Sequence, residues 1–137
     1  MLELLAPAGN LDAVIAAVQN GADAVYMGFG DGFNARRSAD NFTRESFAKA
    51  VRYCHIRGCK VYVTLNTLVG DREMEAAAAL AQQASDAGAD AILVQDLGLA
   101  RVLRAALPDI PLHASTQMSI HNLAGVEAAA EMGITRA

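Results

Sequence analysis

Residues 87–96, which read Ala-Gly-Ala-Asp-Ala-Ile-Leu-Val-Gln-Asp, contain the structural unit that repeats along this chain. Gly88 can end a helix at low cost because glycine adopts the left-handed conformation freely. The unbroken apolar run that follows is typical of a strand buried on both faces, as in a parallel sheet covered by helices. Gln95 and Asp96 then stand at the carboxyl end of that strand, where α/β folds place their functional groups.

The same pattern of a glycine followed by a short apolar run recurs along the chain. It is clear from Asn20 to Gly28, weaker from Arg57 to Thr64, and begins again from Met132 to Ala137. The glycines at these junctions are spaced by about 30 to 45 residues, the length of one strand–helix–strand unit. Right-handed connections between such units produce either a (β/α)8 barrel or a doubly wound sheet.

The sequence after the first apolar run favours the barrel. A dinucleotide-binding sheet would carry Gly-x-Gly-x-x-Gly directly after its first strand, but Pro7 to Asn10 stands there. The glycine-rich run from Gly28 to Phe33 follows the second strand and leads into a long polar loop. We therefore expect an α/β fold, a partial (β/α)8 TIM-type barrel of parallel strands with helices outside.

The predicted elements form one domain over residues 1–137. Apolar runs predict strands over residues 2–6, 22–28, 59–65, 91–94, 112–115 and from 134 onward. Helices are predicted after the capping residues Asn10, Thr43, Asp71 and Asp96, and over residues 122–131. A complete barrel needs about 250 residues, so about five βα units and the start of a sixth strand make a truncated barrel. Its open edge is expected to make the isolated fragment self-associate.

Composition narrows the class of protein further. The net charge is −4 and Lys and Arg are not clustered, so the chain carries no basic patch typical of nucleic-acid binding. No apolar segment approaches the ~20 residues that cross a membrane, and the amino terminus does not resemble a signal peptide. Cys54 and Cys59 lack zinc-ligand spacing, and we expect them to be reduced and structural in a cytoplasmic protein. No metal site is predicted.

Polar residues just past the strands are the candidate site of a barrel. Amides and hydroxyls dominate them, and these groups orient polar ligands well but are poor acids and bases. The candidate substrate-binding residues are Asn10, Asn34, Arg36, Asn66, Gln95, Thr116 and Gln117. Arg36 with Arg37 could hold an anionic group, or could instead form salt bridges that fix the loop.

Two residues are candidates for catalysis. Asp96 is the carboxylate directly at a strand end, and it could act as a general base or cap the next helix. Ser115 as a nucleophile would need an adjacent base. His113 lies two residues before it, but the pair is not a triad, and a structural role for His113 is the plainer interpretation.

Several strings together resemble the collagenase-like peptidase family U-32. They are Leu4–Asn10, Gly21–Gly28, Phe33–Arg36, Val61–Thr67, Ala91–Asp96 and His113–Ser119, in the same order as in that family. The resemblance covers nearly the whole chain. It implies a barrel fold and a peptidase that cleaves a peptide or protein substrate.

The resemblance also implies an alternative activity. Some members of the family serve iron–sulfur-dependent hydroxylation of RNA bases or of a quinone precursor, with the cluster held by four cysteines downstream of the matched region. Neither Cys54 nor Cys59 matches those cysteines, so this chain is expected to hold no cofactor itself. A non-enzymatic ligand-binding barrel is a third possibility.

Overall fold

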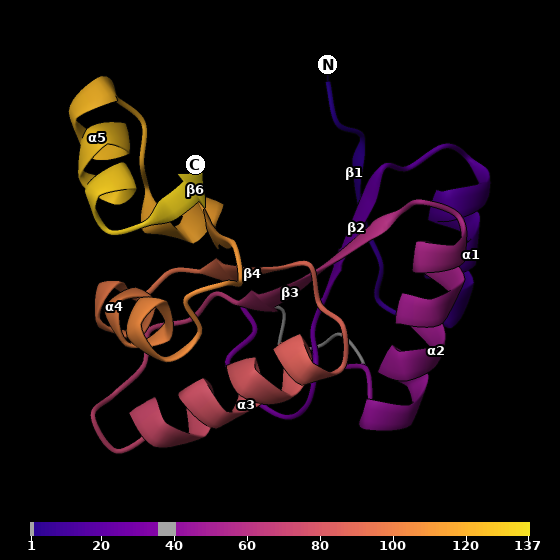
Figure 1. Ribbon diagram of the computed structural model, residues 1–137, viewed down its shortest axis with the longest axis horizontal. Helices are drawn as coiled ribbons and strands as arrows, with labels where there is room; N and C mark the ends of the chain where they lie inside the picture. The colour runs from indigo at the N-terminus through magenta and orange to yellow at the C-terminus, as the bar shows by residue number, and fades with distance from the viewer. Residues whose placement is uncertain (1, 36–40) are drawn as a thin grey trace.

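The computed structural model describes residues 2–35 and 41–137, and in them parallel strands alternate with helices (Figure 1). The six strands form one sheet in the order β1-β2-β3-β4-β5-β6, each paired in parallel with the next. The strands are β1 (Leu5–Pro7), β2 (Ala24–Met27), β3 (Lys60–Leu65), β4 (Ala91–Val94), β5 (Leu112–Ala114) and β6 (Ile134–Arg136). The helices are α1 (Leu11–Gln19), α2 (Arg44–Ile56), α3 (Met74–Asp86), α4 (Leu97–Ala106), α5 (Leu123–Glu131) and the short 3-10 turn η1 (Thr116–Met118).

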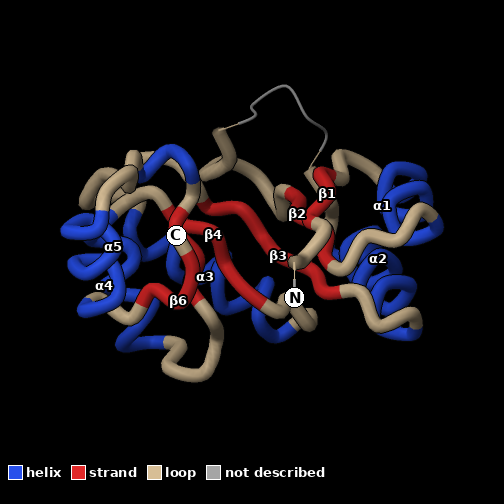
Figure 2. Tube along the Cα trace, turned by 90° about the horizontal axis from the view of Figure 1, so that it is seen from above, coloured by secondary structure: helices blue, strands red, loops and turns tan. Residues whose placement is uncertain are grey.

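This strand order confirms the predicted barrel-type arrangement. In a doubly wound sheet the order reverses at a switch point, whereas a barrel adds each new strand to the same edge. Figure 2 shows the consequence, a curved sheet with the helices along its outer side. The first strand is shorter than expected, because pairing begins at Leu5.

Side-chain caps explain where most helices begin. Asn10, Thr43 and Asp96 each accept a hydrogen bond from a backbone N–H in the first turn of α1, α2 and α4. The predicted cap Asp71 was wrong, since α3 begins three residues later at Met74. The carboxylate of Glu73 instead accepts from the backbone N–H of Gly70 at 3.0 Å, so residues 70–73 form a turn ahead of the helix.

The aspartates of the repeated unit connect neighbouring strands. Asp23, just before β2, accepts from the backbone N–H of Leu4 at 2.7 Å. Asp90, just before β4, accepts from the backbone N–H of Val61 at 2.7 Å and lies 2.8 Å from Nε2 of His55. Each aspartate thus fixes the amino-terminal end of its own strand to the strand before it. His55 is partly exposed and packs over this junction.

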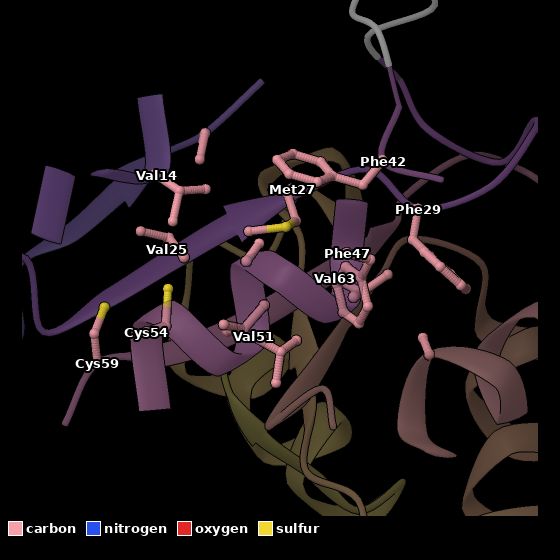
Figure 3. Packing of buried hydrophobic residues seen from close by; sticks show 14 residues of the cluster. Val14, Val25, Met27, Phe29, Phe42, Phe47, Val51, Cys54, Cys59 and Val63 are labelled. Atoms are coloured by element: carbon pink, nitrogen blue, oxygen red, sulfur yellow. The ribbon is translucent and has the colours of Figure 1, made fainter. Parts of the chain in front are cut away.

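The core lies between the sheet and the helices. One cluster joins β2 and β3 to α1 and α2 and includes Val14, Val25 and Phe47, all fully buried (Figure 3). Burying one such side chain contributes roughly 1.5–3 kcal/mol. Cys54 and Cys59 belong to the same cluster and are free thiols, as predicted. A second cluster packs β4 and β5 against α3, α4 and α5.

The inner face of the sheet is lined differently. On this face, Tyr62 donates a hydrogen bond to Glu3 at 3.0 Å, and Arg136 bonds the same carboxylate. This group links the chain before β1 to β6 across the inner side, although those two strands do not pair. Among the described residues, none of the helices is long and apolar enough to span a membrane.

Candidate functional site

A hollow with a volume of about 360 Å³ opens at the carboxyl ends of the strands on the inner side of the sheet. Polar side chains follow β3 and β5 into it, and apolar side chains of Leu5 and Leu93 complete its wall. Its polar lining residues include Thr64, Asn66, His113, Ser115, Thr116 and Gln117. A smaller hollow beside it shares Tyr26, Thr64 and Asn66 and adds Asn34 and Asn41.

Asn66 connects the two sides of this region. Its Oδ1 accepts from the backbone N–H of Ala35 at 3.0 Å, and its Nδ2 donates to Oγ of Ser115 at 3.3 Å. Ala35 belongs to the loop between β2 and α2, whose ends are closed by a bridge between Phe29 and Phe42. Asn66 therefore holds this loop and the end of β5 in a fixed relation to β3.

Ser115 has a defined hydrogen-bonding state. Its Oγ accepts from Nδ2 of Asn66 and from the backbone N–H of Gln117, both at 3.3 Å, and the residue is 6% exposed. Both lone pairs of the hydroxyl are therefore engaged, and its proton is left as a donor. Within the described residues no carboxylate or imidazole contacts Oγ, so the geometry favours a ligand-binding donor over an activated nucleophile.

Asp96 serves as the N-cap of α4. One carboxylate oxygen accepts from the backbone N–H of Leu99 at 2.8 Å, and the other accepts from the backbone N–H of Val69 at 3.4 Å. Asp96 is not among the residues that line either hollow. Of the two interpretations that the sequence left open, this geometry supports the cap, while a catalytic role stays a prediction.

The other predicted binding residues divide into two groups. Asn34, Asn66, Thr116 and Gln117 do lie at the paired hollows, and Asn34 donates to Oδ1 of Asn41 at 3.1 Å. Asn10 caps α1 and lines a separate shallow depression, and half-buried Gln95 lines neither hollow. Arg36 lies outside the described residues.

The inner face contributes residues that the sequence did not single out. Tyr26, Thr64 and Asn41 line the hollows, and His113, given only a structural role above, lines the larger one. The sequence feature that could have identified Thr64 and His113 is the alternation of side chains along a strand, which places both residues on the inner face, opposite the apolar core. Thr64 also donates to the carbonyl oxygen of Met27 at 3.2 Å, which ties β3 to β2.

His113 is an uncharged group at neutral pH. Its side chain is buried, and its ring meets the ring of Tyr62 edge to face, with centroids 4.8 Å apart. Burial, together with the nearby positive charge of Arg136, lowers the pKa of His113 to about 4. A neutral imidazole offers one N–H donor and one nitrogen acceptor to a ligand.

The cysteines of this chain do not fit an iron–sulfur cluster. Burial raises the pKa of Cys54 to about 12 and also raises the pKa of Cys59, which disfavours the thiolates that such clusters require. Across residues 2–35 and 41–137, no group of three or more His, Cys, Asp or Glu side chains is placed to hold a metal ion.

Comparison with known proteins identifies relatives of this chain. The chain is 41% identical over 98% of its length to the 23S rRNA 5-hydroxycytidine C2501 synthase of Escherichia coli, and covers 20% of that protein. It is 38% identical over 98% of its length to tRNA hydroxylation protein P1 of Bacillus subtilis, and covers 32% of it. It is also 36% identical over 88% of its length to a collagenase of Porphyromonas gingivalis, and covers 28% of it. The chain thus spans about a fifth to a third of the length of these relatives.

A solved structure supports the fold. The U32 peptidase Mk0906 superposes with a TM-score of 0.75 at 16% identity, over 98% of this chain and 56% of that one. The sequence profile of peptidase family U32 matches residues 9–137, which is nearly all of the chain. The resemblance expected from the sequence is therefore confirmed, and this chain belongs to peptidase family U32.

Proposed function

We propose that this chain forms the substrate-binding part of a barrel that hydroxylates an RNA base. The observation that carries the proposal is the hollow itself, which is lined by amide and hydroxyl groups, a neutral imidazole and the guanidinium of Arg136. Such groups recognise the polar edge of a nucleobase by matched donors and acceptors. The relatives named for rRNA and tRNA hydroxylation, at 41% and 38% identity, point to the same substrate class.

The charge of the chain limits its part in RNA binding. With a net charge of −4, it offers little attraction to phosphates, which dominate the affinity of most nucleic-acid complexes. We therefore assign base recognition to this chain, and phosphate contacts to parts of the protein outside it. An iron–sulfur cluster, if the protein has one, would likewise need cysteines other than Cys54 and Cys59.

Peptide hydrolysis is the second candidate function. The similarity to the Porphyromonas gingivalis collagenase favours it, and it would assign Asp96 and Ser115 to catalysis. The engagement of both carboxylate oxygens of Asp96 by backbone N–H groups, and of both Ser115 lone pairs, weighs against that assignment.

One experiment separates the two functions. The gene is deleted from its host, and nucleosides from rRNA and tRNA are compared by mass spectrometry for loss of a base that carries one extra oxygen atom. Loss of this nucleoside and its return on complementation is the expected result. Unchanged RNA, together with gelatin cleavage that Ser115→Ala abolishes in the purified protein, would establish the peptidase instead.

A further inference from the structure

We propose that Gly28 is a positioning residue of the site, because the space left by its missing side chain is where the amides of Asn34 and Asn41 meet. These amides hold the loop between β2 and α2 against the end of β2, beside the smaller hollow. The inference rests on the proposed function for its activity measurement. It adds to that function a residue that acts through its neighbours.

Gly28 follows β2 directly, and its site requires glycine for space, not for backbone conformation. The described glycines with a positive φ do not include Gly28. A Cβ atom at this position would overlap both Oδ1 of Asn41 and Nδ2 of Asn34. By contrast, a Cβ atom on Gly9, which lines the same hollow, would meet nothing within 4 Å. Of the two described glycines that line this hollow, only Gly28 is therefore crowded.

The two amides that occupy this space are bonded to each other. Nδ2 of Asn34 donates to Oδ1 of Asn41 at 3.1 Å, and Asn34 is only 9% exposed. Asn41 is fixed by its neighbour Phe42, a buried residue whose backbone N–H donates to the carbonyl oxygen of Gly28 at 3.0 Å. The amide bridge thus joins residues on both sides of the loop to the end of β2.

The same loop is bonded to the larger hollow. Ala35, next to Asn34, donates its backbone N–H to Oδ1 of Asn66 at 3.0 Å, and Nδ2 of Asn66 donates to Oγ of Ser115 at 3.3 Å. The loop therefore connects the end of β2 to the end of β5 through residues that line the two hollows. Because a displacement of about 1 Å in a site can cost about a hundredfold in rate, the position of this loop is expected to affect the reaction.

The test uses the full-length protein and three variants. Gly28→Ala introduces the overlapping methyl group, Asn41→Ala removes the bridge without crowding, and the double variant Gly28→Ala/Asn41→Ala combines the two changes. Gly70→Ala is the matched control, because Gly70 is exposed and its Cβ would meet only the carboxylate end of Glu73, at 3.4 Å.

Three quantities are measured for each protein. The first is the initial rate of RNA hydroxylation after induction in complemented cells, from mass spectrometry of nucleosides. The second is the midpoint temperature of thermal unfolding. The third is the hydrogen exchange of peptides that cover residues 29–35.

We expect Gly28→Ala and Asn41→Ala each to speed exchange in residues 29–35 and to slow hydroxylation by about tenfold to a hundredfold. Gly28→Ala should also lower the unfolding temperature, because overlap in a packed region is strained. In the double variant, Asn34 can turn into the space that the amide of Asn41 leaves. The unfolding temperature should then return to that of Asn41→Ala, while hydroxylation stays slow. Gly70→Ala should match the wild type in all three measurements.

The two levels of the proposal fail in distinguishable ways. Recovery of hydroxylation together with stability in the double variant would show that Gly28 has only a structural role, while the proposed function stands. Wild-type exchange and hydroxylation in Asn41→Ala would overturn the role of the bridge, and this variant decides the matter should Gly28→Ala prevent folding. A wild-type protein that hydroxylates no RNA would overturn the proposed function. Faster exchange in Asn41→Ala would then still support the arrangement around Gly28, and unchanged exchange would overturn it.

Discussion

Asn66 donates a hydrogen bond from Nδ2 to Oγ of Ser115 at 3.3 Å and so connects the ends of β3 and β5 past the intervening strand β4. The same amide accepts from the backbone N–H of Ala35 through its oxygen. The oxygen and the nitrogen of the Asn66 amide are thus both engaged in hydrogen bonds within the protein, and the bond to Ala35 anchors the loop before α2. Asn66, predicted as a substrate contact, is also the residue that positions its neighbours.

Replacing Asn66 with alanine should loosen this arrangement. Two hydrogen bonds are lost, at about 0.5–1.5 kcal/mol each, and the loop around Ala35 loses its attachment to β3. We expect faster proteolytic cleavage within residues 29–42, measured by limited digestion and mass spectrometry. Gln82→Ala is the control, because Gln82 bonds only Asp86 on the exposed side of α3 among the described residues. Equal cleavage of the two variants would contradict the assigned role of Asn66.

The buried state of His113 predicts a pH dependence of stability. The folded pKa of about 4 lies below the ordinary value of 6.5, so the unfolded chain binds more protons between these two values. The free energy of unfolding should therefore rise with pH across this window, by up to about 3 kcal/mol from this residue. At still lower pH both states are protonated and the dependence on His113 ends.

Urea unfolding of the wild type and of His113→Phe, at about pH 5 and about pH 7, measures this effect. The variant should show a smaller increase in stability with pH, because its ring cannot bind a proton. Groups such as Glu3, whose pKa is lowered mainly by its hydrogen bond with Arg136, are present in both proteins and largely cancel. Identical pH profiles would show that His113 titrates normally.

The two thiols should be unreactive in the folded protein. Cys54 and Cys59 are buried, and a pKa of about 12 for Cys54 leaves almost no thiolate at neutral pH. Alkylation by iodoacetamide at about pH 8 should label neither residue until denaturant is added, as followed by peptide mass spectrometry. Rapid labelling of Cys54 under native conditions would mean that the cluster between β2, β3 and α2 opens readily.

The repeated unit explains why the fold was predictable from the sequence. Glycine followed by an unbroken apolar run, as at Gly88, identifies a helix end and a buried parallel strand from local chemistry alone. Asp90 accepts a hydrogen bond from the backbone N–H of Val61 and contacts the imidazole of His55. These partners are distant in sequence, so the two interactions leave no local sequence pattern. Asp71 was assigned a cap because its local pattern did not reveal the turn that Glu73 makes with Gly70.

The site was less predictable than the fold. Strand-end position selected Asn66 and Gln117, and both line the larger hollow, since parallel strands deliver their ends to one edge. It also selected Gln95, which lines neither hollow, and it did not select His113, which lies within β5 and lines the larger one. Which inner-face residue borders a hollow depends on the curvature of the sheet and on the size of its neighbours.

The isolated segment 1–137 is predicted to self-associate. β1 pairs on one side only, and beside it Leu2, Leu4 and Leu5 are 98%, 55% and 36% exposed. An unpaired strand edge with exposed leucines is a ready template for association with a second copy. Sedimentation well above micromolar concentration should therefore show dimers or larger species. Leu4→Lys should shift them toward monomer, because a charge directly beside an unpaired strand edge opposes pairing.

The matched control for this prediction is Leu68→Lys. Leu68 is 72% exposed but lies in the connection between β3 and α3, away from the free edge of β1. If exposed apolar area alone drove association, both variants would reduce it equally. If the edge of β1 drives it, only Leu4→Lys will do so. A monomeric wild-type segment would show that residues 1–137 cover this edge without a partner.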